Sequence, residues 1–247
     1  MFILSILFFV TAILYSSVGF GGGSTYLALL LIWDIPYFIL PVIALVCNVI
    51  VVSGNSYNYI KSGNFNRELL IPYLIGSIPM AFLGGMISIQ KELFELLLFI
   101  VLSFAGILLL INNKSYSEKN FIIKKNNIYI SIIIGSIIGL ISGIVGIGGG
   151  IFLSPILFLF KAGLPRQIAT TASLFILLNS ISGILGQFTK TNVVDELINY
   201  IPLFLVVFIG GQIGNYLNIK FLSNRLLAII TSVLVIIVSI RIGLKIF

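Results

Sequence analysis

Two glycine-rich stretches interrupt apolar segments and carry the residues whose spacing best suits ligand binding. The expected ligand-binding positions in these stretches are Gly21, Gly22, Gly23, Ser24, Gly148, Gly149 and Gly150. A helix broken at such a stretch leaves unpaired N–H groups at the start of its second half, which we expect at Ser24 and at Ile151. These N–H groups and the positive end of the helix dipole bind anions without a charged side chain, and glycine lets a ligand approach the backbone. The sequence therefore predicts an anion site built from backbone groups.

Hydroxyl and amide side chains inside apolar segments form a second candidate group. Its members are Asn48, Thr170, Thr171, Ser173 and Asn179. The two threonines and the serine fall within about one helical turn, so two of them can face a common cavity. Neutral donors of this kind suit a partly hydrated oxyanion, which needs several hydrogen bonds.

Both groups have an alternative interpretation, because small and hydroxylated residues also hold helices together in bilayers. For the hydroxyl and amide group, substrate contact and helix packing weigh equally. For the glycines, their contiguity and their occurrence twice in the chain favour a ligand-binding or hinge role.

The sequence lacks the groups on which most enzymes and metal sites depend. It contains no histidine, which excludes His-based metal sites, haem ligation and Ser-His catalysis. The seven Asp and Glu residues lie in loops or at segment ends, away from the mid-membrane position of a proton relay. A single cysteine, Cys47, allows no intrachain disulfide. We therefore expect no enzymatic activity, no cofactor and no metal.

The elements that must position these residues are membrane helices. Of the 247 residues, 59% are hydrophobic and 9% are charged, with a mean hydropathy of +1.21, whereas soluble domains carry about 25% charge. We expect an all-α polytopic membrane protein with eight apolar segments at 2–32, 38–60, 69–88, 93–111, 128–160, 167–188, 197–219 and 225–246. The net charge of +7 is typical of cytoplasmic loops that contact membrane lipids, and nucleic acid is not an expected partner.

The two halves of the chain resemble each other. "SSVGFGGGSTYLALLLIWDIP" aligns with "SGIVGIGGGIFLSPILFLFKAGLP", so that Pro36 matches Pro165. We interpret this as a first transmembrane repeat at 1–112, a central cytoplasmic loop at 113–127 and a second repeat at 128–247. Repeats with helices broken at matching places are typical of secondary transporters, whose substrate site lies at the repeat interface.

Lys and Arg counts favour one orientation of these segments. If every segment crosses once, the basic residues divide nine to five between the two sides; if the two glycine-broken segments return to their starting side, they divide ten to four. The second arrangement is slightly more polarised and makes the repeats inverted. Both arrangements place the central loop in the cytoplasm.

The duplicated G-x-GGG motif, the "ATTAS" after the second proline and the Gly-rich third and seventh segments resemble the TauE/SafE sulfite exporter family, over nearly the whole chain. The resemblance implies an inner-membrane permease for sulfite, sulfoacetate, other organosulfonates or related small organic anions. It also implies that the glycine motifs and the Thr-rich turn lie near the substrate route. The first half departs from the pattern, because Pro41-Val42-Ile43 stand where the second has Thr170-Thr171-Ala172.

The function expected from the sequence is export of a small sulfur-containing anion across a bacterial cell (inner) membrane by a multi-pass carrier. The expected partners are the anionic substrate and membrane lipids, and a homodimer is left open. An anion channel, or a permease for other small organic anions, is the alternative, since the same helix ends can serve without alternating access. An intramembrane enzyme or a scaffold that transports nothing ranks lower.

Overall fold

The computed structural model consists of helices joined by turns, with no strand among the residues it describes, which are 2–17, 19–111, 127–190, 193–218 and seven positions between 233 and 244. The helices are α1 (Phe2–Ser16), α2 (Gly23–Ile32), α3 (Leu40–Lys61), α4 (Arg67–Met86), α5 (Lys91–Ile111), α6 (Ile128–Val145), α7 (Gly150–Leu159), α8 (Pro165–Gln187), α9 (Val193–Leu197), the 3₁₀ turn Ile198–Tyr200 and α10 (Ile201–Asn218). The predicted central loop lies outside the described residues except for Asn127, as does most of the predicted last segment.

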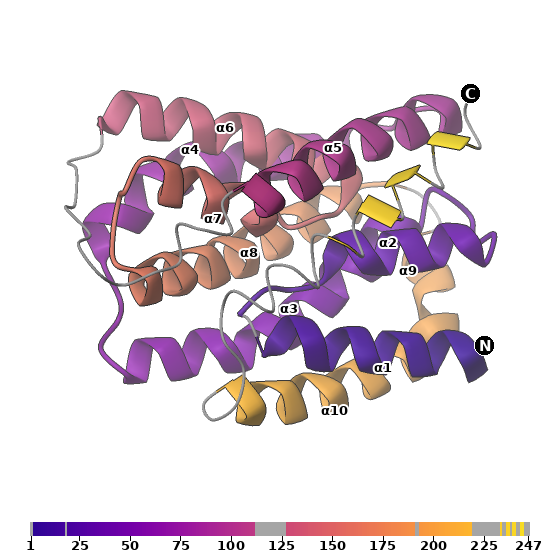
Figure 1. Ribbon diagram of the computed structural model, residues 1–247. Helices are drawn as coiled ribbons and strands as arrows, with labels where there is room; N and C mark the ends of the chain where they lie inside the picture. Colours follow the sequence, from indigo (N-terminus) through magenta and orange to yellow (C-terminus); the bar gives the residue numbers. More distant parts are fainter. Residues whose placement is uncertain are drawn as a thin grey trace.

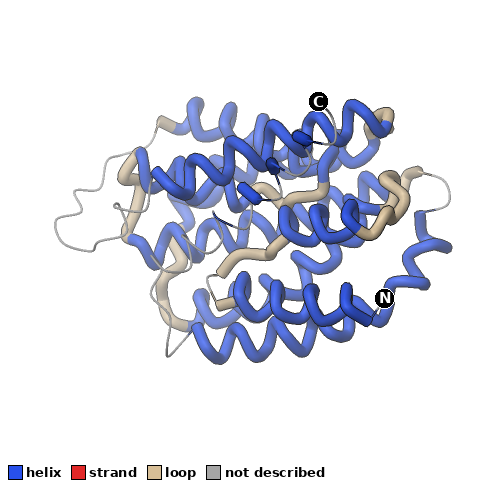
Figure 2. Tube along the Cα trace, turned by 45° about the vertical axis from the view of Figure 1, so that its right-hand side comes forward, coloured by secondary structure: helices blue, strands red, loops and turns tan. Residues whose placement is uncertain are grey.

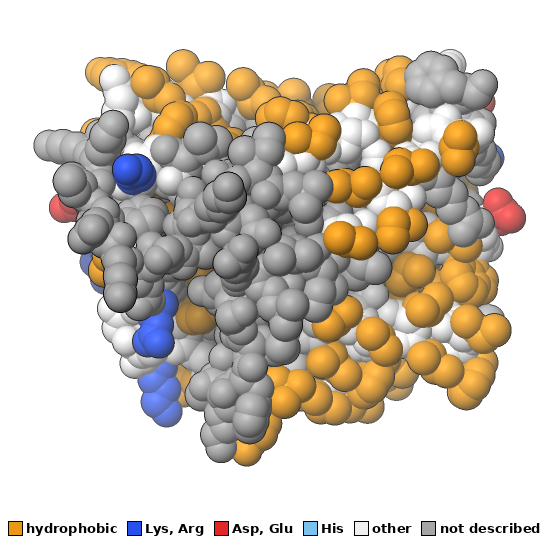
Figure 3. All heavy atoms as spheres, in the orientation of Figure 1, with side chains coloured by type: hydrophobic (Ala, Val, Ile, Leu, Met, Phe, Trp, Pro, Cys, Tyr) orange, Lys and Arg blue, Asp and Glu red, His pale blue; other side chains and the backbone are white. Residues whose placement is uncertain are grey.

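The helices have the length and surface of a multi-pass membrane protein. Within the described residues, five of them are long and apolar enough to cross a membrane. Large apolar side chains are exposed around the bundle, and Figure 3 shows them covering much of the surface, while the visible Lys and Arg side chains gather toward its left-hand end. Since such a surface is stable only in lipid, the predicted all-α polytopic class is confirmed.

Two segments of membrane length are broken in the middle, as the glycine stretches predict. The first break separates α1 from α2 at residues 17–22, and the second separates α6 from α7 at residues 146–149. In Figure 2, loops appear as tan stretches inside the blue bundle. Each second half starts one residue before the predicted position, because Gly22 and Gly149 form the N-caps with φ of 87° and 80°. This left-handed conformation strains a residue with a Cβ, so both positions favour glycine.

Both broken segments turn back and form hairpins. In Figure 1, α2 runs back beside α1, α7 runs back from the end of α6, and the two hairpins open toward opposite ends of the bundle. The ring of Tyr26 on α2 lies 4.7 Å from the ring of Phe8 on α1, between centroids. The arrangement corresponds to the topology in which the glycine-broken segments return to their starting side.

The two ends of the bundle differ in charge. At one end, which we call the basic end, the first turn of α4 meets the turn after α7, where Gly163 lies against Leu69. Among the described residues, its cations are Lys61, Arg67, Lys161 and Arg166, and its acid is Glu68. The opposite end, called the acidic end, carries Asp34, Glu92, Glu95, Asp195 and Glu196 with Lys91 and Lys190.

Small residues allow close approach of the helices around a central antiparallel pair, α3 and α8. Helix α4 lies parallel to α6, where a Cβ on Gly143 would lie 2.9 Å from the carbonyl carbon of Ala81. In the same way α10 lies parallel to α1, where a Cβ on Gly210 would lie 2.7 Å from the carbonyl oxygen of Phe9. Such contacts are the usual basis of helix association in bilayers. They attach α4 to the second hairpin and α10 to the first, and α4 and α10 in turn contact α8 and α3.

Candidate functional site

The two breaks meet at one side chain, that of Asn48 on α3. Asn48 Nδ2 donates a hydrogen bond to the carbonyl oxygen of Ile147 in the second break, at 3.0 Å. Asn48 Oδ1 overlaps the position that a Cβ on Gly21 would occupy, and a Cβ on Gly23 would lie 2.7 Å from Nδ2. A Cβ on Gly148 would also lie 2.7 Å from Nδ2. The Asn48 amide therefore contacts the starts of both returning helices.

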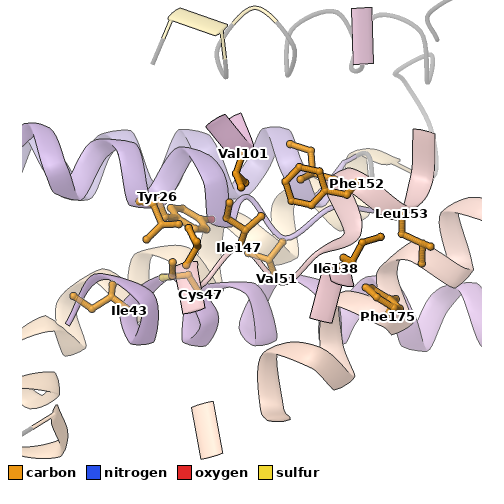
Figure 4. Packing of buried hydrophobic residues seen from close by; sticks show 14 of the residues in the cluster. Tyr26, Ile43, Cys47, Val51, Val101, Ile138, Ile147, Phe152, Leu153 and Phe175 are labelled. Atoms are coloured by element: carbon orange, nitrogen blue, oxygen red, sulfur yellow. The ribbon is translucent and has the colours of Figure 1, made fainter. Parts of the chain in front are cut away.

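The glycines are needed here for space as well as for backbone conformation. Gly23 is the first residue of α2, where the helical backbone accepts any L residue, yet a methyl on it would lie 2.7 Å from the Ile147 carbonyl oxygen. A methyl on Gly150 would overlap Ile176 of α8. Figure 4 shows Ile147 among buried side chains of both halves, with Tyr26 and Cys47 on one side and Ile138 and Phe152 on the other.

The first amides of α2 and α7 precede the first hydrogen bonds of their helices, at the two breaks. The N–H groups of Thr25 and Tyr26 bond to the Gly22 carbonyl, so those of Gly23 and Ser24 precede the first helical bond. In α7 the first bonds likewise run from residues 152 and 153 to the Gly149 carbonyl. Such amides carry partial positive charge, which favours anions.

Buried polar atoms without partners surround the meeting point. Within the described residues, Asn48 Oδ1 and Ser180 Oγ are both buried without a hydrogen-bond partner. Ser180 lies on α8 beside the second break, since a Cβ on Gly148 would lie 2.9 Å from its Oγ. An unsatisfied buried polar atom costs about 1–3 kcal/mol and calls for an explanation. An oxyanion bound here would accept a hydrogen bond from Ser180 Oγ, and a water molecule or a protonated oxyanion would donate to Asn48 Oδ1.

An apolar cluster separates this meeting point from a second polar group nearer the basic end. Phe20 of the first break packs in a small buried cluster with Val52 of α3 and with Ala172 and Ile176 of α8. This cluster lies about one helical turn from Asn48 and Ser180 along their helices. We call it the Phe20 cluster.

The second polar group lies beyond the Phe20 cluster, where α3 and α8 face each other. The Ser56 and Ser173 hydroxyls are 3.1 Å apart, and both side chains are buried. Asn55 is 1% exposed, and neither of its amide atoms has a partner among the described residues. Seven residues separate Asn48 from Asn55, so they share one face of α3.

The structure divides the predicted hydroxyl and amide residues. Asn48 reaches both breaks and Ser173 bonds Ser56, as above. Thr170 Oγ1 donates to the Arg166 carbonyl at 2.8 Å, and Asn179 Nδ2 to the Phe175 carbonyl at 2.8 Å, so both bond within α8. Thr171 Oγ1 is buried without a described partner. These bonds of Thr170 and Asn179 run along α8 and not to the breaks, while Asn179 Oδ1 is buried without a partner among the described residues.

Ser24 and the residue after it lie inside the first hairpin. Thr25 Oγ1 and Tyr15 Oη are 2.6 Å apart, which ties the arms of that hairpin together. Ser24 itself is buried in the first turn of α2. Asn55, Ser56 and Ser180 were not predicted as site residues from the sequence, and neither was the contact between Thr25 and Tyr15. Ser180 could have been found from the helical periodicity, because it lies two turns after Ser173 and therefore on the same face of α8.

The site has no formal charge. The residues that meet at the breaks are glycines, amides and hydroxyls, and the described acids lie in turns or in the first turns of helices at the ends. No group of three or more metal-ligating side chains occurs among the described residues. The arrangement is suited to hydrogen-bonding an oxyanion.

Comparison with known proteins points to transport. The family model "Sulfite exporter TauE/SafE" matches residues 4–242. A probable membrane transporter protein of Sinorhizobium fredii is 29% identical over 243 residues, covering 96% of this chain and 96% of that protein. A probable membrane transporter protein of Methanocaldococcus jannaschii is 29% identical over 258 residues, covering 94% of this chain and 91% of that protein. No solved structure matches.

Proposed function

The chain belongs to the sulfite exporter TauE/SafE family, and from this membership together with the geometry of the breaks we propose that it exports small sulfur-containing anions. Sulfite and small organosulfonates such as sulfoacetate are the proposed substrates. The proposed location is a bacterial cell membrane, where lipids surround the multi-pass bundle. An anion channel or a permease for other small organic anions is the alternative.

The observation that carries the proposal is the convergence of two helix starts on Asn48. Gly23 of α2 and Gly148 before α7 both lie against its amide. An oxyanion here would be bound by backbone N–H groups and by the amide and hydroxyl of Asn48 and Ser180. In the present conformation Asn48 Nδ2 bonds the Ile147 carbonyl. When the substrate binds, the Asn48 Nδ2 group would turn toward the anion. Substrate binding would therefore compete with the hydrogen bond between Asn48 and Ile147.

The packing of the helices supports a pair of inverted repeats. If α1, α2, α3 and α4 correspond to α6, α7, α8 and α10, each contact made in one half has a counterpart in the other. The contact of α4 with α6 then corresponds to that of α10 with α1, and the contact of α4 with α8 to that of α10 with α3. The contact of α2 with α3 corresponds to that of α7 with α8. We infer that residues 1–112 and 128–247 are the two repeats. Rocking of one repeat against the other around a fixed central site would give alternating access.

Charge supports an orientation in which the basic end faces the cytoplasm. Lys61 and Arg67 lie there with Lys161 and Arg166, and positive residues are retained on the cytoplasmic side of membranes. The acidic end, with the start of α1, would then face outward. The negative cell interior favours exit of an anion by about 2.3 kcal/mol per charge per 100 mV. Export driven by the membrane potential therefore needs no carboxylate proton relay.

A flux panel tests the proposed function. The purified protein would be reconstituted into liposomes and assayed for counterflow of labelled sulfite and sulfoacetate, with taurine and acetate as comparison solutes. We expect saturable counterflow of sulfite or sulfoacetate, because a carrier exchanges substrate through one site. Single-channel currents without counterflow would establish the channel alternative. Absence of flux and of binding-induced thermal stabilisation for every anion would contradict the proposal.

A further inference from the structure

A cavity of about 310 Å³ lies at the acidic end, between residues from both halves of the chain. Its polar lining includes Lys190 after α8, Glu196 of α9, and Tyr37 and Ser88 in the turns before α3 and α5. At roughly 30 Å³ per water molecule, it has room for about ten waters or for a small anion with part of its hydration shell. The cavity is separate from the meeting point of the breaks.

The floor of this cavity touches the second break. Pro41 of α3 and Ile144 in the last turn of α6 both line it. Pro41 also packs on Gly146, the first residue of the break, where a Cβ would lie 2.7 Å from the Pro41 carbonyl oxygen. The next residue, Ile147, bonds Asn48. The cavity lining is therefore connected to the candidate substrate site through Gly146 and Ile147, and along α3 through about two helical turns between Pro41 and Asn48.

Lys190 keeps one hydrogen-bond donor for a ligand. Its Nζ donates to the Ile87 carbonyl oxygen at 2.8 Å and to Gln187 Oε1 at 2.8 Å. An ammonium group has three donors, and both recorded partners are neutral. Gln187 is fully buried, and its Nε2 donates to the Gly143 carbonyl at 2.9 Å. Lys190 is thus held at a fixed place, next to the α6 end that leads into the second break.

The charge of Lys190 differs from that of its surroundings. The described residues of the acidic end carry more acids than cations, and the other titratable groups lining the cavity are Glu196 and Tyr37. Asp34, Lys91 and Glu95 line a smaller neighbouring cavity. Burial lowers the pKa of Lys190 to about 8, so it is charged at neutral pH and loses its charge under mildly alkaline conditions.

We infer that this cavity is the outer vestibule of the transporter, and that Lys190 recruits the substrate anion there as it passes between the outer solution and the second break. The inference rests on the proposed function and adds a second, outer binding position for an oxyanion such as a sulfonate. The ligand would accept the remaining N–H of Lys190 and hydrogen bonds from Ser88 or Tyr37. Glu196 would oppose binding and so favour release.

The test is concentration-dependent uptake of sulfoacetate into proteoliposomes at external pH 6.5 to 9.5, with internal pH held at 7. Sulfoacetate is used because its charge is constant over this range. We expect Lys190→Gln to raise KM by roughly five-fold or more, the effect of one unit charge at about 4 Å in largely aqueous surroundings. Wild-type uptake should weaken as external pH rises through 8, whereas Lys190→Arg should keep its low KM to the highest pH.

Lys91→Gln is the matched control, since it removes a cation from the same end but from the neighbouring cavity. Its KM and pH profile should equal those of the wild type. An unchanged KM in Lys190→Gln, with transport intact, would overturn the vestibule while leaving the proposed function standing. If Lys190→Gln does not fold, Lys190→Arg serves as the test. If uptake by Lys190→Arg falls with rising external pH in parallel with uptake by the wild type, the inference is overturned. Absence of wild-type transport would instead contradict the proposed function.

Discussion

Gly21→Ala places a methyl group on the Asn48 side chain, and the collision gives a measurable energy. The new Cβ would overlap Asn48 Oδ1 and lie 2.7 Å from Cγ and 3.1 Å from Cβ of the same residue. Because Gly21 has negative φ, alanine fits its backbone and the collision is the main cost. Overpacking of this kind costs about 1–3 kcal/mol. For a chain of this size, each kcal/mol lowers Tm by roughly 2–4 °C.

A double-mutant cycle isolates that contact. Asn48→Ala removes the overlapping amide, and it also costs about 1 kcal/mol by loss of the hydrogen bond to Ile147. We expect the double variant Gly21→Ala/Asn48→Ala to be no less stable than Asn48→Ala alone, so the coupling energy should be on the order of 1–3 kcal/mol. Thermal unfolding of the purified protein in detergent measures it. Additive effects would refute the claim that the first break packs on Asn48.

Gly211→Ala is the control for this cycle. Its Cβ would lie 3.5 Å from Val51 Cα, which is ordinary contact distance, in the interior of α10. Alanine is favoured over glycine in a helix by about 0.8–1 kcal/mol. This variant should therefore unfold at the same temperature as the wild type or higher.

Three further predictions concern the ends and the barrier. Burial holds the folded-state pKa of Lys190 at about 8, below its ordinary 10.5. Because the unfolded chain then binds more protons between these two values, the Tm of the wild type should rise relative to that of Lys190→Gln as pH goes from 8 to 10.5. Parallel curves of Tm against pH for the two proteins would contradict this. Phe20→Ala thins the Phe20 cluster and should raise passive leak of sulfite through the reconstituted protein severalfold, whereas leak equal to wild type would argue against a barrier there. In intact cells, an impermeant maleimide should label Ser88→Cys but not Asn64→Cys, with the buried native Cys47 silent; the reverse pattern would invert the proposed orientation.

The breaks could be predicted from the sequence because four glycines within five positions weaken a helix whatever surrounds them. The residue at which each returning helix starts could be predicted only to within one position. Gly22 and Gly149 adopt left-handed caps, so α2 and α7 start at Gly23 and Gly150. The return of α2 and α7 depends on packing against α3 and α8, and the Lys and Arg counts gave only a slight preference for it.

The roles of the two asparagines could not be predicted, because both are amides deep in apolar helices. In the structure Asn48 faces the breaks, while Asn179 bonds the preceding turn of its own helix. The two asparagines differ in the direction in which each faces from its helix, and what lies in that direction depends on residues that are distant in sequence. Asn55 and Ser180 were missed for the same reason. Their burial without described partners is visible only once α3, α8 and the breaks are placed together.

Substrate flux in Asn48→Leu, compared with Asn179→Leu, tests the central claim most directly. Both changes replace a fully buried amide by an apolar side chain of similar size, and both variants would be checked for wild-type elution and Tm. A site at the meeting point of the breaks predicts that Asn48→Leu loses sulfite or sulfoacetate counterflow at least ten-fold, about 1.4 kcal/mol. Asn179→Leu should transport within a factor of about two of wild type, under 0.5 kcal/mol on the same scale. Wild-type counterflow in Asn48→Leu, or an equal loss in both variants, would contradict the account.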